Sequence, residues 1–173
     1  MRRKITLFLI ICICFLLQST LFLKLQIAGI APNLIMIVVS SFGFMRGSRE
    51  GMFVGFFCGV ILDLFGGFYL GVYALMYMYV GYLNGIFHKH FYPEDIKLPL
   101  LMIGTSDLVF NVILFGVMFV FRQRFHFGYY LLHIILPEFV YTMIIAIFLY
   151  FILLKINEKL EENEKRSAKK FEF

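Results

Sequence analysis

Charged residues are almost absent from the middle of this chain, and their absence constrains the fold more than any other feature. They gather at the two ends and in short connectors, with long apolar runs between them. Hydrophobic residues make up 61% of the 173 residues, against roughly 45–50% in soluble domains. A soluble protein of this length could not bury so much apolar surface. The pattern therefore predicts an all-α integral membrane protein.

The apolar runs divide the chain into six predicted transmembrane helices. A helix needs about 20 apolar residues to cross roughly 30 Å of hydrocarbon. The second and third runs are shorter, so we expect local thinning of the bilayer or burial against neighbouring helices. A transmembrane domain over residues 1–154 and a polar cytoplasmic tail over residues 155–173 follow, the tail with charge pairs that favour a solvated helix. The expected spans are residues 5–23, 32–45, 51–65, 68–87, 98–121 and 131–154.

The distribution of basic residues predicts the orientation. With six spans both termini lie on the same side, and that side holds thirteen Lys and Arg residues against three on the other. The positive-inside rule then places both termini in the cytoplasm. A cleaved signal peptide is the other interpretation of the first run. Its apolar core is longer than the usual stretch of about 7–15 residues, and Gln18-Ser19-Thr20 is a weak cleavage site.

Glycines recur at intervals of four in the third span and again in the fourth. Residues four apart share a helix face, so each set exposes a strip of bare backbone that another helix can approach closely. We expect these strips to be helix-packing faces, or a face for the helix of a partner protein. The glycines are Gly51, Gly55 and Gly59 in the third span, and Gly81 and Gly85 in the fourth.

Polar side chains inside four of the spans fall at similar depths. At about 1.5 Å per residue they lie ~14–20 Å from the cytoplasmic ends of their helices. The charged members should point into protein, because a carboxylate facing lipid is costly. They act either as structural bonds to neighbouring groups or as a ligand pocket, ion pocket or proton relay. This intramembrane polar layer consists of Gln18, Asp63, Asp107, Asn111 and Glu138.

No catalytic, cofactor or metal site is predicted. The chain has no Gly-x-Ser-x-Gly, no His-Glu-x-x-His and no phosphate-cradling loop. The three cysteines lie in apolar runs, as small fillers do, and the pair His88 and His90 is better explained as a wet interfacial pair than as a metal site. Basic residues form no stripe interleaved with aromatics, so we expect no nucleic-acid partner.

A series of short motifs spans most of the chain and is densest from residue 28 to residue 85. The motifs are Gln18-Ser19-Thr20, Gly29 with Pro32-Asn33, Arg46-Gly47, Gly51, Gly55-Phe56, Gly59, Leu62-Asp63, Leu70-Gly71, Ala74 and Gly81-Tyr82. In this order and spacing they resemble the MreD family, the small membrane subunit of the bacterial rod-shape (elongasome) system. Asn33 departs from the Asp that the family often has after this proline, which weakens any charge-based role there.

The resemblance implies a non-enzymatic scaffold in the bacterial cytoplasmic membrane. Its implied partner is the bitopic protein MreC, and through it the actin-like MreB, RodA and a class B penicillin-binding protein, which together direct sidewall peptidoglycan synthesis. The resemblance also implies a fold similar to the six-helix substrate-binding subunits of energy-coupling vitamin transporters. The alternative function is therefore a transporter subunit that binds a small molecule in the polar layer.

Overall fold

The computed structural model describes residues 2–26, 29–65, 71–90, 92, 96–122 and 127–169, and over these residues it forms helices and no strand. Six helical stretches follow one another, as predicted. The first joins α1 (Arg2–Leu16), the π-helical turn η1 (Leu17–Leu21) and α2 (Phe22–Lys24). The last joins α7 (Phe127–Tyr130), the π-helical turn η3 (Leu131–Ile135) and α8 (Leu136–Lys169). Between them lie α3 (Leu34–Arg46), α4 (Ser48–Phe65), α5 (Val72–Ile86) with the 3₁₀ turn η2 (Phe87–His90), and α6 (Lys97–Arg122).

Several helix boundaries differ from the predicted ones. The third span was expected to begin at Gly51 after a charged turn, but α4 already begins at Ser48. One residue suffices to end α3, because Gly47 adopts φ 94° and donates its N–H to the carbonyl of Gly43 at 2.8 Å. Such a positive φ is open mainly to glycine. The fourth span begins at Val72 within the described residues, and its predicted start at residue 68 lies outside them.

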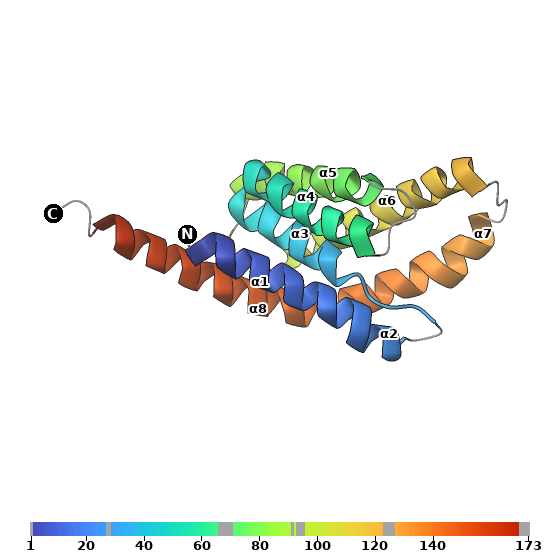
Figure 1. Ribbon diagram of the computed structural model, residues 1–173, viewed down its shortest axis with the longest axis horizontal. Helices are drawn as coiled ribbons and strands as arrows, with labels where there is room; N and C mark the ends of the chain where they lie inside the picture. Colours follow the sequence, from blue (N-terminus) through green and yellow to red (C-terminus); the bar gives the residue numbers. More distant parts are fainter. Residues whose placement is uncertain are drawn as a thin grey trace.

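Most of the predicted polar tail belongs to α8, because this helix continues without interruption to Lys169. Its C-terminal part runs beyond the other helices at one end of the molecule (Figure 1). At the other end, α7 begins at Phe127, so the expected connector over residues 122–130 is shorter than predicted. Residues 123–126 lie outside the described part of the chain.

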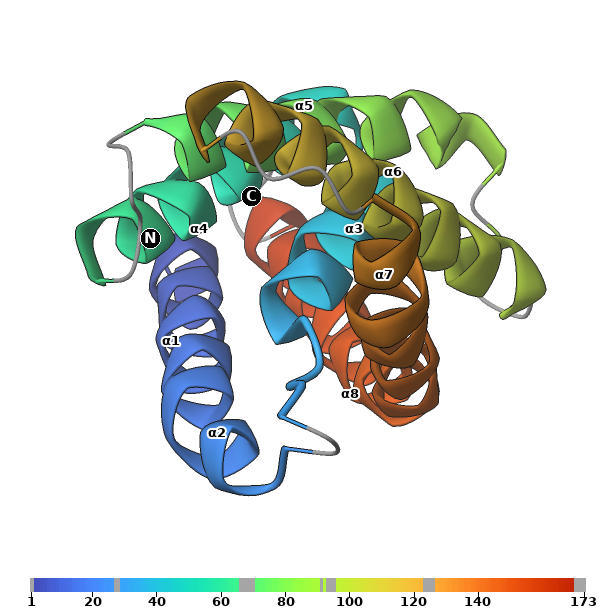
Figure 2. The ribbon, with the colours of Figure 1, turned by 90° about the vertical axis from the view of Figure 1, so that its right-hand side faces the viewer.

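Helix α3 lies at the centre of the bundle. Every residue from Leu34 to Met45 is buried, and α3 contacts α1, α4, α5, α6 and α8. Figure 2 shows it surrounded by these helices. A helix that is apolar all round needs burial on every side. Burial against neighbours, one of the two solutions expected for this short run, is therefore confirmed.

Successive helices run in alternating directions, so the connectors divide between two ends. At one end, the last turn of α3 meets α8 through Arg46 and Asn157, and His88 Nδ1 lies 2.9 Å from the carbonyl oxygen of Phe44. At the opposite end, the Tyr141 hydroxyl donates to the carbonyl of Leu25 at 3.2 Å. The start of α1 and the C-terminal part of α8 consequently lie toward the same end of the bundle (Figure 1).

Large apolar side chains cover the outside of the bundle. The most exposed among the described residues include Phe65 at 76%, Phe148 at 68% and Phe53 at 61%. Two stretches, Lys97–Val117 and Leu131–Glu162, are long and apolar enough to cross a membrane, and Ile5–Leu21 and Leu34–Arg46 are shorter apolar helices. An apolar surface around buried polar groups is the arrangement that lipid favours.

Candidate functional site

The two glycine-bearing faces lie against each other. A Cβ atom built on Gly51, Gly55 or Gly59 of α4 would come within 3.0 Å of backbone atoms of α5. The same holds for Gly81 and Gly85 of α5 against the start of α4. The two helices therefore touch backbone to backbone, which is how small residues pack in membranes. Each face covers the other, so neither is open to the helix of a partner protein.

A sixth glycine, which sequence reasoning missed, extends this contact to the central helix. A Cβ on Gly43 of α3 would approach the carbonyl oxygen of Gly81 to 2.6 Å, and one on Gly51 would approach Gly43 Cα equally closely. Three helices thus meet at three glycines. The signal was present in the sequence, because the spacing of four continues backwards from Gly51 through Gly47 to Gly43, although Gly47 ends α3 and places Gly43 on a different helix.

The structure divides the predicted polar layer into separate sites, and Asp63 is the first. Its carboxylate accepts hydrogen bonds from the backbone N–H groups of Gly71 at 3.0 Å, Tyr73 at 3.2 Å and Ala74 at 2.9 Å. These are the unpaired donors at the start of α5, where the helix dipole also favours negative charge. Asp63 is 6% exposed and thus points into protein, as expected. It joins α4 to α5 through this helix start, apart from the other acids of the predicted layer.

A second site surrounds the start of α3. Asn33 caps the helix, since its side-chain oxygen accepts from the Met36 N–H at 3.0 Å and from the Tyr77 hydroxyl at 2.9 Å. The N–H of Asn33 donates to the Thr142 hydroxyl at 3.0 Å. Asn33, Tyr77 and Thr142 are all buried and come from three parts of the chain. An Asn before an apolar run is an N-cap signal, whereas nothing in the sequence indicates its two distant partners.

Gln18 belongs to this second site. Its side-chain oxygen accepts from the N–H of Ile35 at 3.1 Å, so another unpaired donor at the start of α3 is satisfied from the first helix. Gln18 lies within the π-helical turn η1. Four helices, α1 with its extension, α3, α5 and α8, are therefore joined by hydrogen bonds around one buried helix end.

The third site lies between α6 and α8 and holds the remaining members of the predicted layer. Asp107 is fully buried, and neither of its carboxyl oxygens has a hydrogen-bond partner among the described residues. Glu138 of α8 lies within electrostatic range of Asp107 and near the Asn111 side chain. The Asn111 amide also donates to the Asp107 carbonyl at 3.1 Å. Two acids and an amide thus come together, without Gln18 and Asp63.

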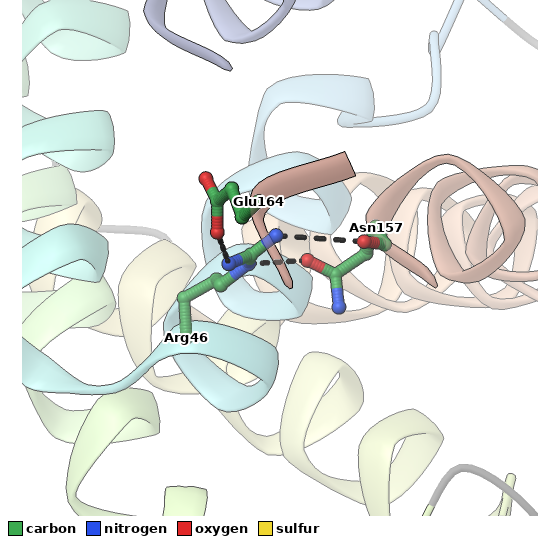
Figure 3. Close-up of polar contacts among 3 residues, drawn as sticks. All are labelled: Arg46, Asn157 and Glu164. Atoms are coloured by element: carbon green, nitrogen blue, oxygen red, sulfur yellow. Dashed lines mark hydrogen bonds and ion pairs between the residues drawn. The ribbon is translucent and has the colours of Figure 1, made fainter. Parts of the chain in front are cut away.

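At the C-terminal end of α3, opposite to the site around Asn33, Arg46 joins this central helix to the extension of α8. Its guanidinium donates to the side-chain and backbone oxygens of Asn157 and to Glu164, the last at 3.2 Å (Figure 3). Asn157 is 2% exposed and lies in the predicted tail. The basic residues of the connectors were predicted only to orient the chain, so this contact was missed.

Cysteine and histidine give no sign of metal chemistry in the described part of the chain. Cys14 and Cys58 are buried in the apolar core, and Cys12 is half-buried. Among the described residues, no group of three His, Cys, Asp or Glu side chains comes together in a way that could hold a metal ion. His88 and His90 are exposed in η2.

Fold and sites together define a class of protein: a small helical membrane protein whose buried polar groups mainly join one helix to another. The chain belongs to the MreD family, because the family model of the rod shape-determining protein MreD matches residues 1–160. This family is a membrane protein family with a role in rod-shape determination. No curated protein and no solved structure shows significant similarity to the chain. The similarity to substrate-binding subunits of vitamin transporters therefore stays a prediction.

Proposed function

We propose that this chain is a non-enzymatic scaffold of the bacterial cell-shape machinery that binds MreC and thereby helps to direct sidewall peptidoglycan synthesis. Membership of the rod shape-determining family carries the proposal. The geometry supports it, since Asp63, Asn33 and Gln18 are engaged by helix ends rather than arranged around a substrate. A scaffold acts through differential binding: complex formation favours one arrangement of the synthase machinery over others.

The proposed topology has six transmembrane helices with both termini in the cytoplasm. Alternating helix directions support it, as does the α8 extension, which lies toward the same end as the start of α1 (Figure 1) and there meets Arg46 of α3. Basic residues concentrate at this end, which the positive-inside rule assigns to the cytoplasm. Reporter fusions after residues 26, 92 and 173 test the topology, and a periplasmic reporter active at the C-terminus would contradict it.

The MreC-binding surface lies outside the glycine faces on this proposal, because α4 and α5 cover them mutually. Outward-facing apolar side chains on peripheral helices remain available, and α1 alone exposes Phe8, Ile13 and Leu16 by more than half of their surface. MreB, RodA and the class B penicillin-binding protein would be reached indirectly, through MreC.

Co-purification tests the proposed function. The tagged full-length chain is co-expressed with MreC from the same organism and purified in a mild detergent. We expect MreC to co-elute at a fixed ratio, and an unrelated bitopic protein of similar expression to be absent. A monodisperse, folded chain that retains no MreC under any mild detergent would contradict the proposal.

The small-molecule subunit is less well supported. That function requires a cavity on which side chains of several helices converge. The Asp63 carboxylate is fully engaged by the N-terminus of α5, which removes one of the expected ligand-binding groups. The two carboxyl oxygens of Asp107, in contrast, have no hydrogen-bond partner among the described residues, so Asp107 needs a separate explanation.

A further inference from the structure

Asp107 is the most unusual buried group among the described residues. It lies in the middle of α6, so the backbone N–H groups around it are used within the helix and no end of α6 is nearby to donate to it. It is 0% exposed, and both carboxyl oxygens lack a partner among the described residues. An unpaired carboxylate in an apolar interior costs several kcal/mol unless a counter-charge or donors compensate. Either a bound cation or a proton is therefore needed to neutralise it.

The surroundings of Asp107 supply further oxygens and no positive charge. Glu138 of α8 lies within electrostatic range, and the Tyr77 hydroxyl of α5 also interacts with Asp107. No Lys, Arg or His side chain is buried in the described part of the chain. The nearby His133 is exposed in η3, about one turn before Glu138. The side chains around Asp107 therefore supply more hydrogen-bond acceptors than donors.

Two more buried oxygens lack a partner among the described residues, and one of them, on Asn84, lies at about the height of Asp107. The contact of Asn84 with Ser106 at 2.7 Å and the ring contact of Tyr77 with Phe110 bracket Asp107 along α6. Asn84 uses its amide nitrogen in that contact, and its side-chain oxygen has no partner among the described residues. The Ser41 hydroxyl of α3 likewise has none there. Each of these unsatisfied atoms is an oxygen.

We propose that Asp107 and Glu138 bind one small hard metal cation, of the Na⁺ or Mg²⁺ class, between α6 and α8. Hard cations prefer carboxylate, amide and hydroxyl oxygens, which are the groups present. Zinc-like binding is disfavoured, because no third His, Cys, Asp or Glu joins the pair in the described residues. The cation neutralises the buried charge and ties α6 to α8, next to the Asn111 side chain, whose amide donates to the Asp107 carbonyl. This site goes beyond the scaffold function and does not depend on it.

Salt-dependent thermal stability tests the proposal on the purified full-length chain in lipid nanodiscs. Unfolding is followed in NaCl, KCl or MgCl₂, with N-methyl-D-glucamine chloride at equal ionic strength as a cation too large to bind. A ligand that binds only the folded state raises the midpoint in a saturable way. We expect one small cation to do so for the wild type, and the response to disappear in Asp107→Asn. Glu162→Gln, a change at an exposed acid of α8, is the matched control and should respond like the wild type.

Direct binding of ²²Na⁺, or of Mg²⁺ by calorimetry, provides the second measurement. We expect one site per wild-type chain and about tenfold or greater weakening in Glu138→Gln, which keeps the proposal testable if Asp107→Asn fails to fold. Equal midpoints in all salts with no binding would overturn it. A midpoint that depends on pH but on no metal cation would also overturn it, since the acid would then be protonated and need no metal.

Discussion

The α4–α5 pair and the α6–α8 pair solve the same problem differently. Both bury an acid in apolar surroundings, Asp63 in one and Asp107 in the other. Asp63 receives three backbone N–H groups from the start of α5, whereas Asp107 receives none from the described residues. The first acid is explained by the fold alone. The second is not, and the difference separates a structural acid from a candidate binding site.

The pairs also differ in how their glycines are used. On α4 each glycine of the predicted face touches the backbone of α5, while a Cβ atom added to Gly116 of α6 would have no atom within 4 Å. Glycine is therefore indispensable along the α4 face and replaceable at Gly116, while Gly104 of α6 is intermediate, because an added Cβ would lie 3.1 Å from the Met143 and Phe139 side chains of α8. Regular spacing distinguishes them, since the α4 glycines repeat every four residues and Gly116 stands alone.

The largest effect is expected from Gly59→Leu. Its side chain would overlap the backbone of Ala74 and Tyr73, which cannot move without separating α4 from α5. Overpacking of this kind costs about 3 kcal/mol or more, so we expect little folded protein by size-exclusion chromatography. Gly116→Leu makes the same change in open space and should behave like the wild type. Equal recovery of the two variants would remove the contrast between the pairs.

The next effect compares the two acids directly. Asp63→Asn weakens a carboxylate that serves three donors, and we expect a loss of about 2 kcal/mol in unfolding free energy. Asp107→Asn removes a buried charge without breaking a described hydrogen bond, so in buffer without small metal cations it should be neutral or stabilising. The measurement is reversible unfolding in mixed detergent micelles. If both variants lost equal stability, the distinction between the acids would fail.

A smaller effect is expected at the start of α3. Tyr77→Phe removes one of the two hydrogen bonds to the Asn33 oxygen, while the bond from Met36 remains. The expected loss is about 1 kcal/mol. Tyr79→Phe, an exposed tyrosine on the same helix, is the control and should cost nothing measurable. A Tyr77→Phe variant as stable as this control would show that the hydrogen bond is not needed.

The smallest effect is expected at the ion pair between α3 and the α8 extension. Glu164→Gln removes a charge whose side chain is 41% exposed, so the expected change is below about 0.5 kcal/mol. Asn157→Ala, which removes the buried partner of Arg46, should cost more. Thermal midpoints of the two variants in one buffer give the order, and the reverse order would contradict the burial difference.

The sequence was most informative where a single physical constraint acts. Apolar runs predicted six helices, because a membrane requires backbone groups to be satisfied within each segment. Short-range signals also worked: the glycine spacing indicated close helix packing, and Pro32-Asn33 precedes α3 as a helix start. Depth counting could not indicate which partners the polar layer has, because Gln18 and Asp63 accept from helix ends that only the folded arrangement brings near them.

Long-range polar contacts could not be predicted. Asn33 meets Thr142 across 109 residues, and Arg46 meets Asn157 across 111. No spacing rule connects residues so far apart, and each pair depends on how α8 packs against α3. The central position of α3 was equally hidden, since a short apolar run can be buried or face lipid with the same composition.

The stability of the Gly55→Ala variant, purified without any partner, tests the central claim most directly. The added methyl group would overlap the Tyr77 carbonyl of α5, so we predict that the isolated chain unfolds at a clearly lower temperature than the wild type. An unchanged unfolding temperature in the isolated chain, with loss of MreC binding alone, would contradict the account, because the glycine face would then belong to the partner.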